Sequence, residues 1–225
     1  MSKPWKDDEL KSAIEAYIFM LEKTRNGEKL NKAKTYRELA LKHGRDANAF
    51  EYRMSNISYV LALHGRQWLK GLSPLSNAGH NIVTRMESIL SKIENRPINH
   101  SVIVESKVNQ ELSKTKLSEP RGKIKPKKSI SEGIVYDRDP SVKAWVLKIA
   151  KGVCELCNNK APFKSVGGVE FLEVHHVVRL ADGGPDVIEN AVALCPNCHR
   201  EMHYGIKQFE KMEVIYGNVG RLKRF

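Results

Sequence analysis

The sequence predicts an α+β protein built from an all-helical N-terminal domain and a small C-terminal domain of strands and helices. Apolar residues recur at the three-and-four spacing of helices through the first 95 residues. Short runs of β-branched residues indicate strands in the last third of the chain, where all four cysteines also lie, in two C-x-x-C pairs. These observations indicate a helical domain followed by a domain that a metal ion holds together.

The chain is strongly basic, with 38 Lys and Arg against 26 Asp and Glu and a formal net charge of +12. This balance favours a polyanionic partner, nucleic acid first, although a merely solvated surface would show it too. The first residues carry charges where a signal peptide needs an apolar run, and no stretch reaches the roughly 18 apolar residues of a membrane span. We therefore expect a soluble cytoplasmic protein without a membrane partner.

Four helices are expected in residues 1–95, which form the predicted helical domain. The first runs from about 7 to 24, and a short second helix ends at the pair His43-Gly44, where glycine supplies a helix stop. A third ends before Gly65 and a fourth before Pro97, because glycine and proline both favour helix ends.

Residues 96–135 read as a basic flexible linker, with nine basic and four acidic side chains. Its stretch SKTKLSEPRGKIKPKKS has a Pro, Ser and Lys content that does not build a core. The lysines would add phosphate contacts that do not depend on sequence, or the segment only spaces two domains. Both alternatives stay open.

Residues 136–225 form the predicted C-terminal domain. Its expected elements are a helix from Asp139-Pro140 to Gly152, a strand within Glu170 to Val178, a strand from Ala191 to Leu194, and a helix from Pro196 to Gly205. The order of strand, strand and helix places two pairs of histidines close to the cysteines.

The two C-x-x-C pairs have the spacing of a zinc site, Cys154 with Cys157 and Cys195 with Cys198. Four thiolates fill all the positions of a tetrahedral ion, so the site would be closed and would stabilise the fold. A redox role is the alternative. Neither pair opens a helix in a βαβ context, where redox pairs usually lie.

Four histidines lie beside these cysteines. The adjacent His175 and His176 point to opposite faces of a strand, whereas His199 and His203, four residues apart on a helix, share one face. One strand histidine can therefore join the helical pair as a metal ligand, while its neighbour remains available for proton transfer.

The run E-V-H-H, then Asn190 and then C-P-N-C-H-R-E-M-H resembles the HNH, or ββα-metal, nucleases with a four-cysteine zinc site. Residues 135 to 204, from V-Y-D-R-D-P-S-V-K-A-W to C-H-R-E-M-H-Y, are similar to the C-terminal domain of McrA-type modification-dependent restriction endonucleases, over about a third of the chain. The resemblance implies that 136–225 is an HNH endonuclease domain acting on double-stranded DNA.

By this resemblance His176 is the general base, and Asn190 fixes the loop that orients it. His175, His199 and His203 would hold one catalytic divalent cation. The residues fit this chemistry, because histidine titrates near neutrality and a cation with open positions stabilises charge on a phosphate. Imidazole ligands suit zinc, nickel, cobalt or manganese better than calcium. Magnesium completes the set of candidate ions.

Three charged residues near this cluster have two readings each. Glu173 shares a strand face with His175 and would either support it or be a solvated carboxylate. Arg179 and Arg200 would either clamp phosphate oxygens or remain on the surface.

The N-terminal run G-R-D-A-N-A-F-E-Y-R-M-S-N-I-S-Y-V-L, with W-L-K-G-L-S-P-L-S-N-A-G after it, resembles the domain ahead of HNH modules in other such nucleases. It is also similar to sulfur-binding domains that recognise phosphorothioate DNA. That resemblance implies a basic helix face of Arg45, Tyr52, Arg53 and Asn56, and an apolar pocket at Pro74. Lys and Asn residues around 26 to 34 are further candidates for base contacts. For Tyr52, packing within the helical domain is the competing interpretation.

We therefore expect a restriction endonuclease that recognises phosphorothioated DNA. The alternatives are an HNH endonuclease that restricts 5-methylcytosine or 5-hydroxymethylcytosine DNA, a nonspecific nuclease, and a non-cleaving DNA-binding protein. One HNH site cuts one strand, so a double-strand break requires a homodimer or sequential nicks. The tail KQFEKMEVIYGNVGRLKRF packs on its own domain or on a second protomer.

Overall fold

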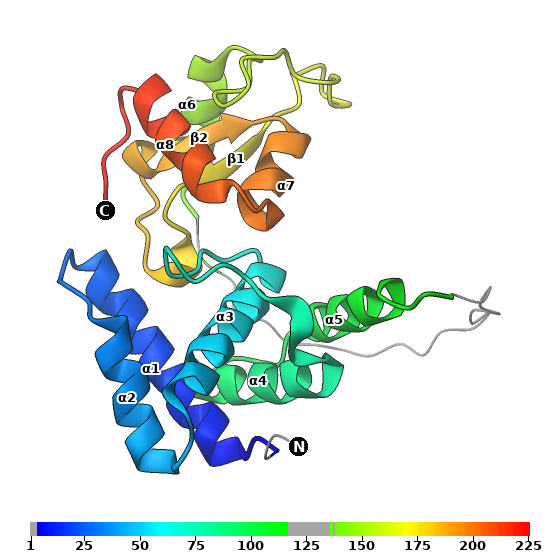
Figure 1. The fold of residues 1–225 in the computed structure, drawn as a ribbon. Coiled ribbons are helices and arrows are strands. Elements are labelled where there is room, and N and C mark those ends of the chain that lie inside the picture. Colours follow the sequence, from blue (N-terminus) through cyan, green and yellow to red (C-terminus); the bar gives the residue numbers. More distant parts are fainter. Residues whose placement is uncertain (1–3, 117–135, 137) are drawn as a thin grey trace. The chain divides into compact units, whose positions relative to one another are not determined.

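The computed structural model describes residues 4–116, 136 and 138–225, and the chain divides into two compact units, 1–134 and 135–225 (Figure 1). The helices of the first unit are α1 (Asp7–Arg25), α2 (Lys32–His43), α3 (Ala47–Leu63), the short η1 (Ser76–Ala78), α4 (His80–Ile93) and α5 (His100–Leu112). The first four predicted α-helices are confirmed. Gly44 ends α2 in the left-handed conformation, with φ of 62°, as a glycine helix stop requires.

The core of the first unit is formed where α1 packs on α3 and α4. Leu10, Ile14 and Tyr17 lie on one face of α1 and are fully or almost fully buried. The hydroxyl of Tyr17 lies 2.7 Å from the Ser58 hydroxyl and accepts a hydrogen bond from the backbone N–H of Leu69. This buried polar group is therefore satisfied, and it joins α1 to α3 and to the chain that follows α3.

The fifth helix corrects the predicted domain boundary. Residues 100–112 were expected in a flexible linker, but they form α5, which packs on α3 and α4 and buries Val102 completely. Asn99 caps α5 by accepting a hydrogen bond from the N–H of Ser101. The helical unit thus extends past residue 95, because one apolar face and one cap are enough to dock a largely polar helix. The rest of the expected linker, 117–135, lies outside the described residues.

The second unit is a small ββα arrangement. Its elements are α6 (Pro140–Ala150), β1 (Glu173–His176), the short helices η2 (Leu180–Asp182) and η3 (Ile188–Asn190), β2 (Ala191–Leu194), α7 (Pro196–Tyr204) and α8 (Gln208–Asn218). β1 and β2 are antiparallel, with Glu173 opposite Leu194 and His176 opposite Ala191. β1 is shorter than the predicted stretch of 170–178, because β2 lies between η3 and Pro196 and offers only four partners.

The C-terminal tail packs on its own unit. Ile215 of α8 is fully buried in the second core, and Arg221 donates two hydrogen bonds to the carboxylate of Glu155. That carboxylate also accepts from the N–H of Ala193 in β2. Glu155 lies between the first two cysteines, so the tail helps to hold that loop against the sheet. None of the helices in the described part of the chain is both long and apolar enough to span a membrane.

Candidate active site

The hairpin of β1 and β2, with α7 packed against it, positions four histidines (Figure 1). His175 lies opposite Val192 and His176 opposite Ala191, so the two adjacent side chains leave β1 on different faces. Both are buried. His199 and His203 lie one turn apart on α7, which starts at Pro196, as predicted. The structure thus separates His176 from the other three histidines.

His175, His199 and His203 form a compact nitrogen cluster. Their candidate ligand atoms all lie within 4.8 Å of one another, and the Nε2 atoms of His199 and His203 are 3.1 Å apart. Burial, followed by the charges of His203 and His199, lowers the pKa of His175 well below its usual range. A neutral imidazole is the form that binds a metal. The three residues therefore fit one divalent cation.

Glu173 contacts a histidine of α7. Its Oε2 lies 2.6 Å from Nδ1 of His199, on the side of the ring away from Nε2. The sequence left two interpretations open, support of His175 on the same face of β1 or a solvated carboxylate. The contact with His199 is a third arrangement, and it forms because α7 packs on β1. A carboxylate at Nδ1 leaves Nε2 free to face the cation position.

Asn190 closes the loop between the two strands. It is fully buried, its Oδ1 accepts from the N–H of Val178, and its Nδ2 donates to the carbonyls of Val178 and Pro185. A loop held at both ends in this way keeps the region after His176 in one conformation. This geometry agrees with the loop-fixing role expected for Asn190.

Asp186 is the residue that sequence reasoning missed. One of its carboxylate oxygens lies 2.7 Å from Nε2 of His176. It comes from the closed loop, ten residues after the histidine. A loop carboxylate gives no periodic signal, and its position depends on Asn190. The Gly-Gly-Pro-Asp run after the strand is the one sequence feature that points to it.

The four cysteines form a second cluster, and their sulfur atoms also lie within 4.8 Å of one another. The sulfurs of Cys157 and Cys195 are 4.0 Å apart. A tetrahedral zinc ion with bonds of about 2.3 Å places its sulfur ligands about 3.8 Å apart, so the spacing fits. Burial alone would raise the pKa of the Cys154 thiol, but backbone N–H groups of Cys157 and Cys195 outweigh it and lower that pKa. The four cysteines are therefore arranged as a zinc site.

The tentative DNA contacts of the first unit do not form one exposed face. Arg45 precedes α3, donates to both carboxylate oxygens of Glu9, and stacks on the ring of Trp5 at 4.4 Å. Arg53 stacks on the same ring at 4.4 Å, and its Nη1 donates to Oδ1 of Asn56. Asn56 is buried, whereas Tyr52 is 65% exposed. Three of the four side chains thus contribute to the packing of this unit.

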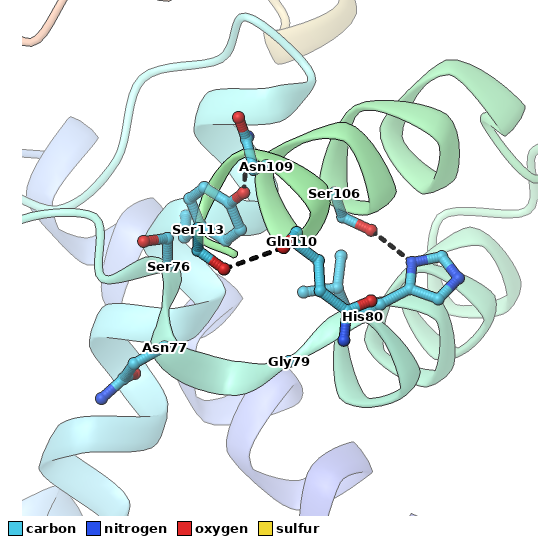
Figure 2. A pocket seen from close by; sticks show the side chains of 10 residues that line it. Ser76, Asn77, Gly79, His80, Ser106, Asn109, Gln110 and Ser113 are labelled. Carbon is cyan, nitrogen blue, oxygen red and sulfur yellow. Dashed lines mark hydrogen bonds between the residues drawn. The ribbon is translucent and has the colours of Figure 1, made fainter. Parts of the chain in front are cut away.

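The apolar pocket expected at Pro74 stays a prediction. Pro74 is half-buried. A separate cavity of about 340 Å³ lies among residues that follow it in the sequence, and most of the residues that line it have polar side chains (Figure 2). Figure 2 labels Ser76, Asn77, Gly79, His80, Ser106, Asn109, Gln110 and Ser113 around it. Their hydroxyls and amides come from η1, the start of α4 and α5, so the polarity arises from the helix that the sequence did not reveal.

The sequence of the second unit is similar to that of known proteins. Residues 154–205 match the HNH family, described as HNH endonuclease. The second unit therefore contains an HNH domain, an α+β fold with a four-cysteine cluster beside the histidines.

The chain is also similar to type IV restriction enzymes. The chain is 45% identical over 129 residues to the Type IV methyl-directed restriction enzyme EcoKMcrA of Escherichia coli strain K12, a match that covers 57% of this chain. It spans only 46% of that enzyme's length. Among solved structures, the Type IV phosphorothioation-dependent restriction endonuclease ScoMcrA is 38% identical, over 37% of this chain and 19% of the other, with a TM-score of 0.34.

Proposed function

We propose that this protein is a modification-dependent DNA endonuclease that hydrolyses phosphodiester bonds with one HNH site. The observation that carries the proposal is the separation of His176 from the cluster of His175, His199 and His203 across β1. One face of the strand thus offers a proton acceptor, and the other offers a cation site. Phosphodiester hydrolysis needs both functions.

In this proposal His176 takes a proton from the water that attacks phosphorus, and Asn190 keeps its loop in place. A divalent cation held by the three histidines supplies stabilisation of the negative charge on the phosphate and the leaving oxygen. Manganese, nickel, cobalt, magnesium and zinc are the candidates. Arg200 is exposed on α7 and can contact a phosphate oxygen. The charge of Arg179 helps to lower the pKa of His175, so this arginine acts on the proposed cation site.

The change His176→Ala tests this assignment. We expect it to abolish cleavage while DNA binding stays within a few fold, because a general base contributes to chemistry more than to docking. The exposed His100 on α5 provides a matched control, and His100→Ala should cut at the normal rate. Retained cutting by the His176 variant would remove this residue from the mechanism.

The modification that we propose is phosphorothioate. The support is the similarity of the run around Tyr52 and Arg53 to sulfur-binding domains. A phosphorothioate sulfur is larger and more weakly hydrated than oxygen, so half-buried cationic and aromatic groups can favour it. Arg53 meets this description, because its guanidinium is half-buried against Trp5 and burial lowers its pKa to about 10.

Methylated cytosine is the second candidate, and the likeness to the methyl-directed enzyme EcoKMcrA favours it. A cleavage assay separates the two on plasmids of one sequence that are unmodified, phosphorothioated or cytosine-methylated, with manganese, nickel or cobalt added. We expect only the phosphorothioated plasmid to be cut. Equal cutting of all three would indicate a nonspecific nuclease, and binding without cutting a DNA-binding protein.

Each chain has one proposed HNH site, and this limits how it can cut a DNA duplex. One copy would nick supercoiled plasmid, and a linear product would require two copies or two successive nicks. We therefore include a homodimer on DNA in the proposal. We also propose that the protein acts in the cytoplasm. Sedimentation of the protein with a duplex that contains one modified site would show how many copies bind.

A further inference from the structure

His176 makes a close contact outside the cation cluster. Its Nε2 lies 2.7 Å from Oδ1 of Asp186, and the two side chains are 9% and 19% exposed. The other ring nitrogen, Nδ1, is therefore the one left to face a substrate. The histidine cluster lies on the other face of β1, so this contact belongs to the proton-transfer side of the site.

The position of Asp186 does not depend on His176. The second oxygen of its carboxylate accepts a hydrogen bond of 2.6 Å from the N–H of Asp139, the residue that caps α6. The carbonyl of Pro185, directly before it, accepts a hydrogen bond from Nδ2 of Asn190. Gly184 approaches the chain so closely that an added Cβ would lie 2.0 Å from the carbonyl oxygen of Val178. The N–H of Asp139 thus holds the carboxylate, and two further contacts hold the backbone directly before it.

The carboxylate is also charged. Burial would raise the pKa of Asp186, but the N–H of Asp139 and the contact with His176 outweigh burial and lower that pKa. An ionised carboxylate has only acceptors. The proton in the contact must therefore belong to Nε2 of His176.

We propose that Asp186 is a positioning residue that fixes His176 in the Nε2–H tautomer, so that Nδ1 is the atom that accepts the proton of the attacking water. The inference rests on the proposed function. The water gives one proton to Nδ1 as its oxygen forms a bond to phosphorus. The bond from phosphorus to the leaving oxygen breaks, and its electron pair stays on that oxygen. Carboxylates position histidines in this way in serine hydrolases.

A competing role for Asp186 is purely mechanical, since it joins the interstrand loop to the start of α6. The change Asp186→Asn separates the two roles. An amide oxygen can still accept from the N–H of Asp139, and the amide N–H₂ then points at Nε2 of His176. That donor requires the opposite tautomer, in which Nδ1 carries the proton and cannot accept another.

The experiment uses the full-length protein in three forms, the original chain, Asp186→Asn and Glu189→Gln. Glu189 is in the same loop, and its carboxylate pairs with Lys223, so Glu189→Gln makes the same chemical change outside the contact. Nitrogen-15 NMR of the imidazoles, with His176 assigned from the His176→Ala spectrum, reports the tautomer. Single-turnover cleavage and DNA binding are measured on the same samples.

We expect the Nε2–H tautomer in the original chain and in Glu189→Gln, and the Nδ1–H tautomer in Asp186→Asn. The cleavage rate of Asp186→Asn should fall by about 10³ to 10⁴, as in a serine hydrolase whose carboxylate becomes an amide, with DNA affinity and thermal stability retained. An Nδ1–H tautomer in the original chain, or an unchanged rate for Asp186→Asn, overturns the proposal.

If Asp186→Asn unfolds, Asp186→Glu replaces it, because a longer carboxylate keeps the acceptor and should keep the Nε2–H tautomer. An Nδ1–H tautomer in that variant would also overturn the proposal. The NMR measurement needs no cleavage. A protein that cuts no DNA but shows the Nε2–H tautomer would therefore contradict the proposed function and leave the positioning of His176 standing.

Discussion

Nδ1 of His199 lies 2.6 Å from Oε2 of Glu173, so a carboxylate at the start of β1 orients a candidate ligand on α7. The contact joins two elements that are 26 residues apart in the chain. A carboxylate in this place fixes which ring nitrogen faces the cation and raises its basicity. The strand thus contributes both a candidate ligand, His175, and the support for another candidate, His199.

The change Glu173→Gln should weaken binding of manganese or nickel by about 10-fold to 100-fold, the usual effect of removing such a support. Calorimetric titration of the metal into the zinc-loaded protein measures it. Glu170→Gln is the matched control, because Glu170 pairs with Lys164 on the surface. An unchanged metal affinity of Glu173→Gln would show that the contact between Glu173 and His199 does not support metal binding.

Much of the site could be predicted, because strand and helix periods place residues that are close in sequence. His175, His199 and His203 needed only the alternation of a strand and the four-residue repeat of a helix. Asp186 could not be placed, since its position comes from a loop that Asn190 closes. The ion pair of Arg45 could not be predicted for a similar reason. Its partner Glu9 is 36 residues away, and a surface arginine and an ion-paired one look alike in sequence.

Helix α5 also could not be predicted from the sequence, for a similar reason. Its inner face has the apolar Val102 and Ile103 and the polar Ser106, a short stripe within a polar, lysine-containing segment. Composition therefore favoured a linker. The docking depends on Glu87 of α4, whose carboxylate accepts from the N–H of Asn99, the cap of α5. Such a contact between distant residues has no local pattern.

Removal of zinc should unfold the second unit and spare the first. The two units have separate cores, and a small domain with four metal-bound thiolates gains much of its folding free energy from the ion. We expect Cys154→Ser to lower the bound zinc measured by atomic absorption and to make residues after 138 sensitive to protease. The helices before residue 113 should stay protected.

Ser12→Ala is the control for that experiment, because Ser12 belongs to α1 in the other unit. It should leave the zinc content unchanged. If Cys154→Ser retained full zinc and protection, the four cysteines would not be a structural site, and the redox interpretation would return.

The buried carboxylate of Glu87 should stabilise the first unit. It is fully buried, 2.6 Å from His64 and 2.7 Å from Arg96. Glu87→Gln removes the charged acceptor that faces Arg96 and the His64 ring, which costs about 3 kcal/mol in unfolding free energy, the low end for a broken buried pair because Arg96 keeps Glu94. Urea unfolding measures the loss. Glu105→Gln, an exposed change on α5, should cost almost nothing.

The lowered pKa of Glu87 predicts that the stability of the first unit depends on pH. Burial would raise the pKa of Glu87, but hydrogen bonds from His64 and Arg96 outweigh it and lower the pKa from 4.5 to about 2. The folded state therefore binds this proton less readily than the unfolded chain. The stabilisation is complete above about pH 4.5 and is lost as the pH falls toward 2. The unfolding free energy of Glu87→Gln should fall less steeply with pH in this range than that of the original chain. Equal slopes for the two proteins would contradict the lowered pKa of Glu87.

The discrimination between modified and unmodified DNA should reside in residues before 117. A deletion that ends at residue 95 would be a poor test, because it leaves α5 behind with Val102 uncovered. A newly exposed apolar surface promotes aggregation for reasons unrelated to DNA. A chain that starts at residue 135 removes the whole helical unit and keeps the second core intact.

We expect this shorter chain to cut unmodified and modified plasmids at equal, low rates, because the HNH residues remain while the proposed recognition unit is gone. The salt dependence of DNA binding should become shallower, since the removed part has more basic than acidic side chains and each lost phosphate contact lowers the slope by about one. Filter binding across a range of salt concentrations gives this slope. A shorter chain that still preferred one modification would place recognition in the second unit, next to the exposed Tyr204 of α7.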